Sequence, residues 1–288
     1  MARGLSIHVG LNTVDPAHYN GWDGRLAACE YDAGDMQRIA EAKGFDSTIL
    51  LSKEATSESV SNAIRNAADE LEPGDMLFLT YSGHGGQVPD TNSDEKGDAT
   101  DETWVLYDRQ LVDDELYALW AAFAPGVRIF VLSDSCHSGS VTRDLFDALV
   151  PQIVERGMVD TPKPRTRELP RDVQDATYRA NEETYKAIQS SHESGENVDV
   201  GAGVVLISGC QDNQLSLDGD RNGLFTQTLL GVWDDGNWEG NYRAFWKAIG
   251  GKMPPTQSPN YFVAGARDRA FQQQTPLTIS AVPAMSRR

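Results

Sequence analysis

The sequence contains few cysteines and no long hydrophobic run. Its three cysteines are Cys29, Cys136 and Cys210, and their spacing fits neither a CxxC metal cluster nor a disulfide framework. A reduced, intracellular compartment is the simplest expectation. The N-terminus lacks the apolar core of a secretory signal, and no window approaches the roughly 20 apolar residues of a membrane-spanning helix. We therefore expect a cytoplasmic protein without a membrane partner.

Positive charge is also scarce. The chain of 288 residues has 25 Lys and Arg residues against 43 Asp and Glu residues, which gives a formal net charge of −18. Nucleic-acid binding needs a cationic surface that displaces counterions, so this composition argues against it. The compatible partners are cationic: a divalent metal ion, or protein substrates rich in Lys and Arg.

Apolar runs alternate with segments of helical periodicity. The runs MLFLTY (76–81), VRIFVL (127–132) and GVVLIS (203–208) are continuous, which is typical of strands buried on both faces. Residues 26–42 and 56–71 show helical spacing. The alternation predicts an α/β fold with a mainly parallel central sheet and helices on both faces. In such folds the loops after the strands carry function.

A long polar segment interrupts this pattern. Residues 145–200 are polar, and their centre, TPKPRTRELPR (161–171), is rich in Pro and Arg. We interpret the segment as a mobile insertion that is helical around residues 178–189.

Two chemically versatile residues directly follow predicted strands. His84 follows the first apolar run and Cys136 follows the second, so neighbouring parallel strands would bring them together. A thiolate nucleophile needs a proton donor for the leaving amine and donors for the oxyanion. The bare backbone of Gly85 and Gly86 lets amide groups approach a substrate. The alternative is a buried structural cysteine and an unrelated loop histidine.

The segments around these residues resemble a known family. TYSGHGG around His84 and DSCHSGS around Cys136 are similar to the two signature blocks of the metacaspases, which are caspase-like cysteine peptidases. Further similar blocks occur in the order LAACEYDAGDM, VVLISGCQDNQLS, GLFTQTLL and QSP. Together the blocks span residues 5–262.

The resemblance implies the caspase-hemoglobinase fold, a three-layer sandwich with a mainly parallel sheet of about six strands. We expect a single domain over residues 1–288, with the insertion at 145–200 and no prodomain. Nothing in the sequence demands an oligomer, so we expect a monomer without an organic cofactor.

The resemblance also implies the chemistry. Cys136 would be the nucleophile and His84 the acid/base, with the backbone N–H groups of Gly85 and Cys136 at the oxyanion. The family cleaves after Arg or Lys, and the matching specificity pocket consists of Asp134, Asp32, Cys29 and Ser82. Without the family, Asp32 is more simply a solvated carboxylate near a helix start. Two further alternatives stay open: a caspase-fold peptidase of other specificity, and a non-catalytic caspase-like scaffold.

Many metacaspases resemble calcium-activated zymogens. The matching calcium ligands are Asp101, Asp113, Asp114 and Asp144. Carboxylates are suitable calcium ligands, but Asp113 and Asp114 also fit a plain helix N-terminus. The segment from Asp218 to Gly223 imitates the first half of an EF-hand loop, yet lacks the final Glu. We interpret it as a turn before a helix.

Self-cleavage follows from the Arg or Lys specificity. The insertion offers four basic residues in an exposed, Pro-rich stretch, where nicking concentrates. The candidates are Lys163, Arg165, Arg167 and Arg171. The alternative is an inert loop.

Overall fold

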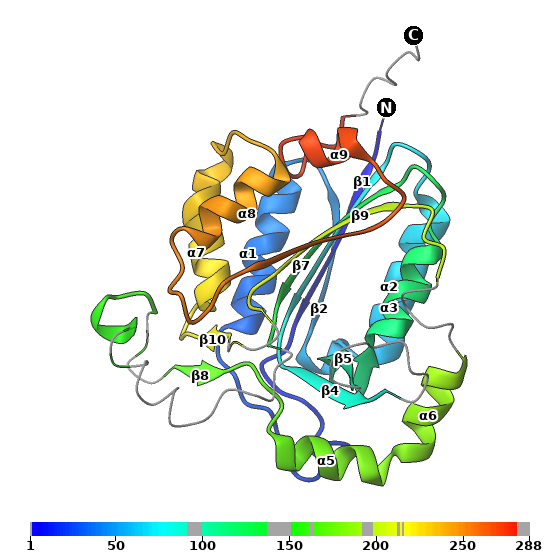
Figure 1. Cartoon of the computed structure of the whole chain (residues 1–288), viewed down its shortest axis with the longest axis vertical. Coiled ribbons are helices and arrows are strands. Elements are labelled where there is room, and N and C mark those ends of the chain that lie inside the picture. Colours follow the sequence, from blue (N-terminus) through cyan, green and yellow to red (C-terminus); the bar gives the residue numbers. More distant parts are fainter. Residues whose placement is uncertain are drawn as a thin grey trace.

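A mixed six-stranded sheet forms the centre of the computed structural model (Figure 1). The structure describes residues 2–90, 100–136, 151, 153–159, 161, 164–191, 198–211, 214 and 216–280. In spatial order the strands are β11 (Asn260–Gly265), β9 (Gly203–Ser208), β7 (Arg128–Asp134), β3 (Met76–Ser82), β1 (Gly4–Gly10) and β2 (Asp46–Leu51). All neighbours pair in parallel except β11, which is antiparallel to β9. The six strands and the helices on both faces confirm the expected caspase-type sandwich.

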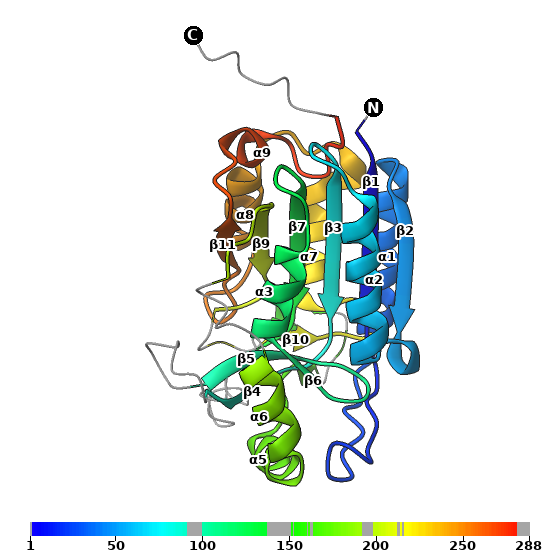
Figure 2. The same cartoon turned by 90° about the vertical axis from the view of Figure 1, so that its right-hand side faces the viewer.

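Helices cover both faces of this sheet (Figure 2). On one face lie α1 (Cys29–Ala42), α7 (Leu224–Trp233) and α8 (Tyr242–Gly250), and on the other lie α2 (Ser57–Glu70) and α3 (Asp113–Ala121). Short α9 (Arg269–Gln273) lies near the amino ends of the parallel strands.

Successive side chains along the strands point to alternate faces of the sheet, and this gives the protein two separate hydrophobic cores. Leu77 and Leu79 of β3 belong to the cluster that contains residues of α2 and α3. Phe78 belongs to the cluster that contains residues of α1, α7 and α8. Because successive side chains of a strand point to opposite faces, a continuous apolar run fills both cores. This explains why MLFLTY contains no polar face.

Smaller elements gather at the carboxyl edge of the sheet (Figure 1). An antiparallel sheet consists of β4 (Gly85–Pro89), β5 (Thr100–Val105) and β6 (Gln110–Val112). A two-stranded sheet pairs β8 (Arg165–Thr166) with β10 (Leu217–Asp218). The polar segment also contains α5 (Arg171–Ala180) and α6 (Glu182–Ser191).

The helical pair α5–α6 is anchored on the β4–β6 sheet. Tyr185 of α6 is fully buried. Its hydroxyl is 3.0 Å from Nε2 of His18 and accepts a hydrogen bond from the Gln110 amide at 3.2 Å. Gln189 donates hydrogen bonds to the Pro89 carbonyl and to the Asp101 carboxylate. These contacts fix the position of the chain that follows β8.

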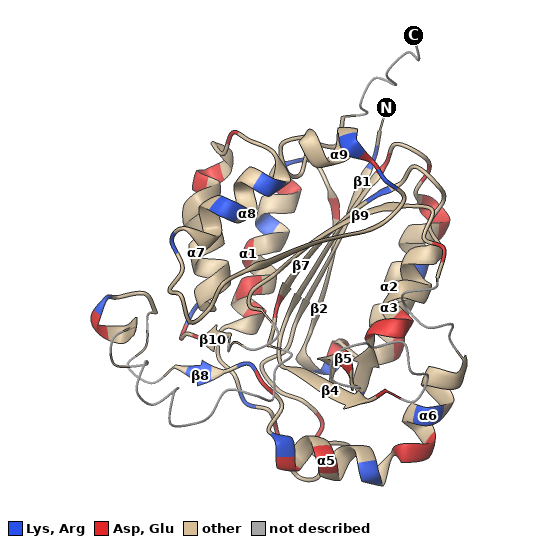
Figure 3. Cartoon of the chain, viewed as in Figure 1, with Lys and Arg blue, Asp and Glu red and all other residues tan. Residues whose placement is uncertain are grey.

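Acidic residues occur on helices on both sides of the sheet (Figure 3). In the part of the chain that the structure describes, no helix is long and apolar enough to cross a membrane.

Candidate active site

His84 lies in the short connection between β3 and β4, at the carboxyl edge of the sheet. Its Nε2 is 3.0 Å from the Gly24 carbonyl oxygen, and the Trp22 ring lies 4.7 Å from the imidazole between centroids. A carbonyl only accepts hydrogen bonds, so Nε2 carries the hydrogen and Nδ1 keeps its lone pair. Nδ1 makes no hydrogen bond to another side chain among the described residues, and the backbone of Glu168 lies close enough to the imidazole to act on its pKa. Nδ1 is therefore the nitrogen that can take up a proton.

Burial sets the protonation state of His84. The imidazole is 5% exposed, and burial lowers its pKa to about 4. The Gly24 carbonyl acts in the opposite direction without reversing the shift. His84 is therefore neutral at physiological pH and can act as a base.

Cys136 follows the neighbouring strand β7. Ser82 of β3 is paired with Asp134 of β7, so the connections that leave these strands start side by side. The Cys136 thiol donates a hydrogen bond to the Gln214 carbonyl at 2.7 Å. The backbone at Gly85 approaches so closely that a Cβ there would lie 2.1 Å from the Cys136 carbonyl oxygen. Glycine is therefore required beside His84.

An extended segment, Arg165–Leu169, crosses this site, and we call it the strap. On one side it pairs as β8 with β10, and the Arg167 amide donates to the Ser216 carbonyl at 2.9 Å. On the other side Glu168 is bridged to Gly85, and the Leu169 amide donates to the Gly85 carbonyl at 2.8 Å. Continuous backbone pairing of this kind is how extended peptides bind to strand edges.

The Arg167 carbonyl oxygen lies between two backbone N–H groups. It accepts hydrogen bonds from the Gly85 amide at 3.0 Å and from the Cys136 amide at 3.2 Å. These two N–H groups are the donors expected from the sequence. Two backbone donors on one carbonyl oxygen polarise its bond to carbon, and the same donors would stabilise a negative charge on that oxygen.

The Arg167 side chain fills an acidic pocket beside this carbonyl. Its exposed fraction is 0%. Nη1 is 2.8 Å from the Ser82 hydroxyl and 2.9 Å from Asp134 Oδ2. Nη2 is 2.7 Å from Asp32 Oδ2 and 3.0 Å from Asp218 Oδ1. Burial acts to lower the pKa of Arg167, but the surrounding carboxylates outweigh it and raise the pKa above its ordinary value.

The structure therefore brings together the pocket residues expected from the sequence. Asp32, which residue patterns alone would leave in solvent, is 1% exposed, and burial raises its pKa to about 6 even though the Arg167 guanidinium opposes this shift. Cys29 is buried nearby, with its Sγ 4.0 Å from Asp218 Oδ1. Burial raises the pKa of this thiol well above its ordinary value.

Sequence reasoning missed two pocket residues, Asp218 and Gly223. Asp218 provides a third carboxylate and also accepts hydrogen bonds from the amides of Ala27 and Ala28, just before α1. Gly223 lies against the guanidinium, since a Cβ there would be 2.6 Å from the Arg167 Cζ. The available signal was the acidic turn from Asp218 to Gly223, but its place in space depends on the pairing of β8 with β10.

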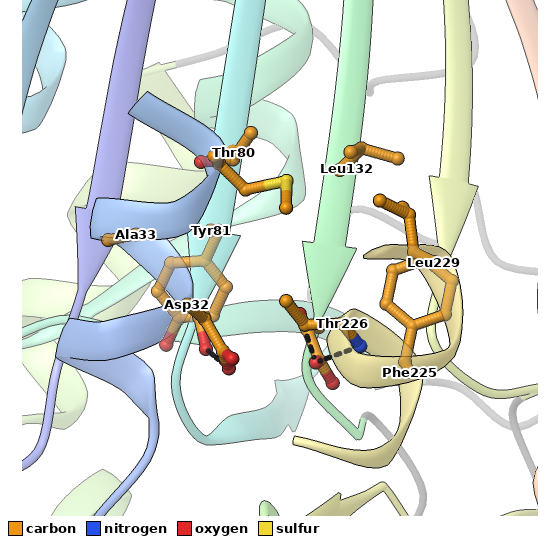
Figure 4. A pocket seen from close by; sticks show the side chains of 11 residues that line it. Asp32, Ala33, Thr80, Tyr81, Leu132, Phe225, Thr226 and Leu229 are labelled. Carbon is orange, nitrogen blue, oxygen red and sulfur yellow. Dashed lines mark hydrogen bonds between the residues drawn. The ribbon is translucent and has the colours of Figure 1, made fainter. Parts of the chain in front are cut away.

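Further hydrogen bonds hold the pocket carboxylates in place. Asp134 accepts from Ser216 and from both the amide and the hydroxyl of Thr226, and Asn222 donates to Asp32. Asp32 and Asp134 also line a small cavity between α1 and α7, whose other lining side chains are largely apolar (Figure 4). Because the carboxylates are held by neutral donors, the pocket keeps its negative charge in a fixed geometry.

Three of the four residues expected to bind calcium lie in the described part of the chain. Asp101 is buried and accepts a hydrogen bond from Gln189 at 2.6 Å, whereas Asp113 and Asp114 open α3. Asp144 lies outside the described residues. Within the described ranges, no three carboxylate, imidazole or thiol groups are placed to hold a metal ion.

The four basic residues of the polar segment have different positions. Arg167 lies in the pocket, Arg165 is exposed on β8, and Arg171 is the first residue of α5. Lys163 lies outside the described residues.

The sheet, with its helices on both faces, is that of a caspase-like protein. A family model for the caspase domain matches residues 13–280, and the chain belongs to this family. Protein GSU0716 from Geobacter sulfurreducens, known from a crystal structure, is 50% identical with a TM-score of 0.83, and the match covers 96% of this chain and 99% of that one.

Named relatives are metacaspases. Metacaspase-1 of Mycosarcoma maydis is 28% identical over 250 residues, which cover 77% of this chain and 59% of the relative. Metacaspase-1 of Schizosaccharomyces pombe is 31% identical over 193 residues, which cover 60% of this chain and 44% of the relative. The chain thus spans about half the length of these metacaspases.

Proposed function

We propose that this protein is a cysteine endopeptidase that cleaves after Arg, and that its own Arg167–Glu168 bond is a substrate. One observation carries the proposal. The guanidinium of Arg167 lies among three carboxylates while its carbonyl oxygen accepts hydrogen bonds from Gly85 and Cys136. This is the arrangement that a peptidase needs for the residue before the scissile bond.

The reaction follows from the side chains present. Nδ1 of His84 takes the proton of the Cys136 thiol, and the sulfur attacks the carbonyl carbon of the arginine. The amides of Gly85 and Cys136 stabilise the resulting oxyanion. Nδ1 returns the proton to the leaving amine, and the C–N bond breaks. Water, deprotonated by the same imidazole, then hydrolyses the thioester and releases the arginine carboxylate.

The pocket favours Arg over Lys. The two Nη groups of Arg167 point at different carboxylate walls, formed by Asp134 on one side and by Asp32 and Asp218 on the other. A lysine ammonium is a single point charge without a planar fork, so it cannot match both walls equally well. We therefore expect Lys substrates to be cleaved more slowly than Arg substrates.

Self-cleavage is tested by intact mass. We expect purified wild type to yield two fragments that end at Arg167 and begin at Glu168, because the carbonyl of that bond accepts a hydrogen bond from the Cys136 amide. The matched variant Cys136→Ala should keep its full mass, since it lacks the proposed nucleophilic thiol. The conservative variant Arg167→Lys should be cut more slowly and Arg167→Gln not at this bond.

Two results would contradict the assignment. Cleavage after Arg165, Arg171 or Lys163 instead of Arg167 would show that the Arg167–Glu168 bond is not the substrate. Equal processing of wild type and Cys136→Ala would show that a different protease cuts the chain.

Cleavage of separate substrate molecules is measured with peptides that carry Arg, Lys, Asp or Asn before a reporter group. Cleavage only after Asp would overturn the proposed specificity.

Calcium stimulation is a separate part of the proposal, supported by the resemblance to metacaspases. We expect faster cleavage of an Arg reporter peptide in calcium than in chelator. Equal rates in both conditions would remove this part and leave the proposed peptidase activity intact.

A further inference from the structure

The strap continues beyond the Arg167–Glu168 bond, and its next apolar residue is deeply buried. Leu169 is 1% exposed and belongs to the same cluster of buried apolar side chains as Trp104 and Leu111. Glu168, between the bond and Leu169, is only half-buried. On this side of the bond, therefore, the second residue is the one whose side chain enters the protein.

The backbone fixes the register of this residue relative to the bond. The Leu169 amide donates to the Gly85 carbonyl, while the Gly85 amide donates to the Arg167 carbonyl. One residue, Gly85, thus holds the chain on both sides of the bond. Any peptide that places its arginine carbonyl in the same position would have its second following residue directed to the place of Leu169.

A glycine leaves space for this side chain. At Gly86 an added Cβ would lie 3.1 Å from Leu169 Cδ2 and 2.6 Å from Gln110 Oε1. The Leu169 side chain therefore packs directly over the Gly86 backbone. Removal of the strap would leave an apolar recess there, and refilling it with an aliphatic side chain would again bury apolar surface.

We propose that the protein contains an aliphatic subsite for the side chain of the second residue after the cleaved bond, with Gly86 as the floor of this subsite. The preferred substrates then have the form Arg, any residue, Leu, with cleavage directly after Arg. This inference rests on the proposed function and adds a second determinant of substrate choice to the acidic pocket. The subsite selects against small residues, because their side chains leave the recess unfilled. It also selects against charged residues, because their charge would lose its hydration in the apolar recess.

The test uses internally quenched peptides with the strap sequence Arg-Thr-Arg-Glu-Leu and with Ala, Asp or Lys in place of Leu. The unaltered full chain is the enzyme, so no variant has to fold. We expect kcat/KM to fall by about tenfold or more from Leu to Ala and further for Asp and Lys. Ratios within twofold, or a preference for a charged residue, would overturn the subsite.

A reporter peptide that ends in Arg, with the reporter group in place of the following residues, separates this inference from the proposed function. If the reporter is cleaved but the quenched peptides show no preference, the subsite is wrong and the peptidase stands. If the reporter is not cleaved, the proposed function itself fails.

A variant identifies the floor of the subsite. In Gly86→Ala the Leu to Ala ratio of kcat/KM should decrease towards one, because the new methyl group occupies part of the recess. The ratio compares two peptides on the same protein, so a general loss of activity does not affect it. Gly231→Ala is the matched control, because a Cβ at Gly231 meets nothing within 4 Å. An unchanged ratio in a folded Gly86→Ala protein would overturn the role of Gly86.

Discussion

At the scale of residues, different side chains of the acidic pocket contact the two Nη groups of the Arg167 guanidinium. Asp134 and Ser82 hold one Nη group, and Asp32 and Asp218 hold the other. Without a cation between them, the three carboxylates would repel each other. The proposed substrate pocket would therefore favour a positively charged side chain over a neutral one. Asp218 differs from the other two because it also accepts the two amides before α1.

This geometry gives a prediction for Asp218→Asn. Asp218 accepts from Ala27 through Oδ2 and from Ala28 and Arg167 Nη2 through Oδ1. The single amide oxygen of Asn can keep the shorter bond from Ala27, while its NH2 group takes the place of Oδ1. The pocket therefore loses one negative charge and one acceptor on the Nη2 side. We expect kcat/KM for an Arg reporter to fall by about tenfold, with a smaller fall for a Lys reporter. Steady-state kinetics on both reporters measures this. Asp220→Asn, at an exposed position of the same turn, is the control. Equal losses for Arg and Lys would contradict a role in discrimination.

At the scale of elements, the strap connects parts of the fold that are distant in sequence. It pairs with β10 before the Arg167–Glu168 bond and with the start of β4 after it. The chain then enters α5 and α6, where Tyr185 and Gln189 anchor it on the small sheet. The strap is therefore held at both ends by rigid elements, and its centre lies in the buried surroundings of His84.

We expect this burial to be visible in the titration of His84. In Cys136→Ala the strap stays uncut, and the His84 imidazole should titrate at about pH 4, since burial disfavours its charged form. NMR of labelled histidine measures the midpoint. A midpoint close to the ordinary value of 6.5 would show that the imidazole is solvated and the strap undocked.

At the scale of the molecule, the sequence predicted most of what depends on local patterns. The runs around Leu79, Val131 and Val205 form buried strands because their apolar side chains serve two cores. Since strands of one parallel sheet end at one edge, His84 and Cys136 could be placed together without coordinates. Asp32 and Asp134 came from the resemblance to metacaspases.

Other features depend on contacts that no local pattern encodes. Asp218 has the local appearance of a turn, and only the pairing of β10 with β8 brings it to the pocket. From composition alone, the basic residues of the polar segment were equivalent candidates for self-cleavage. The pairing of β8 with β10 leaves Arg165 exposed, whereas Arg167 is buried in the acidic pocket. Leu169 looks like an isolated apolar residue in a polar stretch, and its burial depends on the recess over Gly86.

A buried histidine in the central sheet gives a prediction for global stability. His8 of β1 is fully buried against Thr80, and burial lowers its pKa to about 3. The unfolded chain binds a proton at His8 below pH 6.5, and the folded chain does so only near pH 3. The contribution of His8 to stability is therefore complete above pH 6.5 and decreases as the pH falls.

We expect the unfolding free energy of wild type, relative to His8→Asn, to fall by about 1.4 kcal/mol per pH unit between pH 6 and 4. Chemical denaturation at several pH values measures the difference between the two proteins, in which the other titrating groups cancel. A difference that does not change with pH would show that His8 is not buried in its neutral form.

The continuity of the strap with its flanking elements has a consequence for any molecule that competes for the pocket. Because Arg167 is covalently attached, it does not dilute: its effective concentration at the carboxylates is set by the tether and is the same in a crowded cell and in a dilute assay. A free arginine peptide must compete with this local ligand, so its apparent affinity for the intact chain understates the intrinsic affinity of the pocket. Measured against uncut protein, even a well-matched inhibitor will look weak.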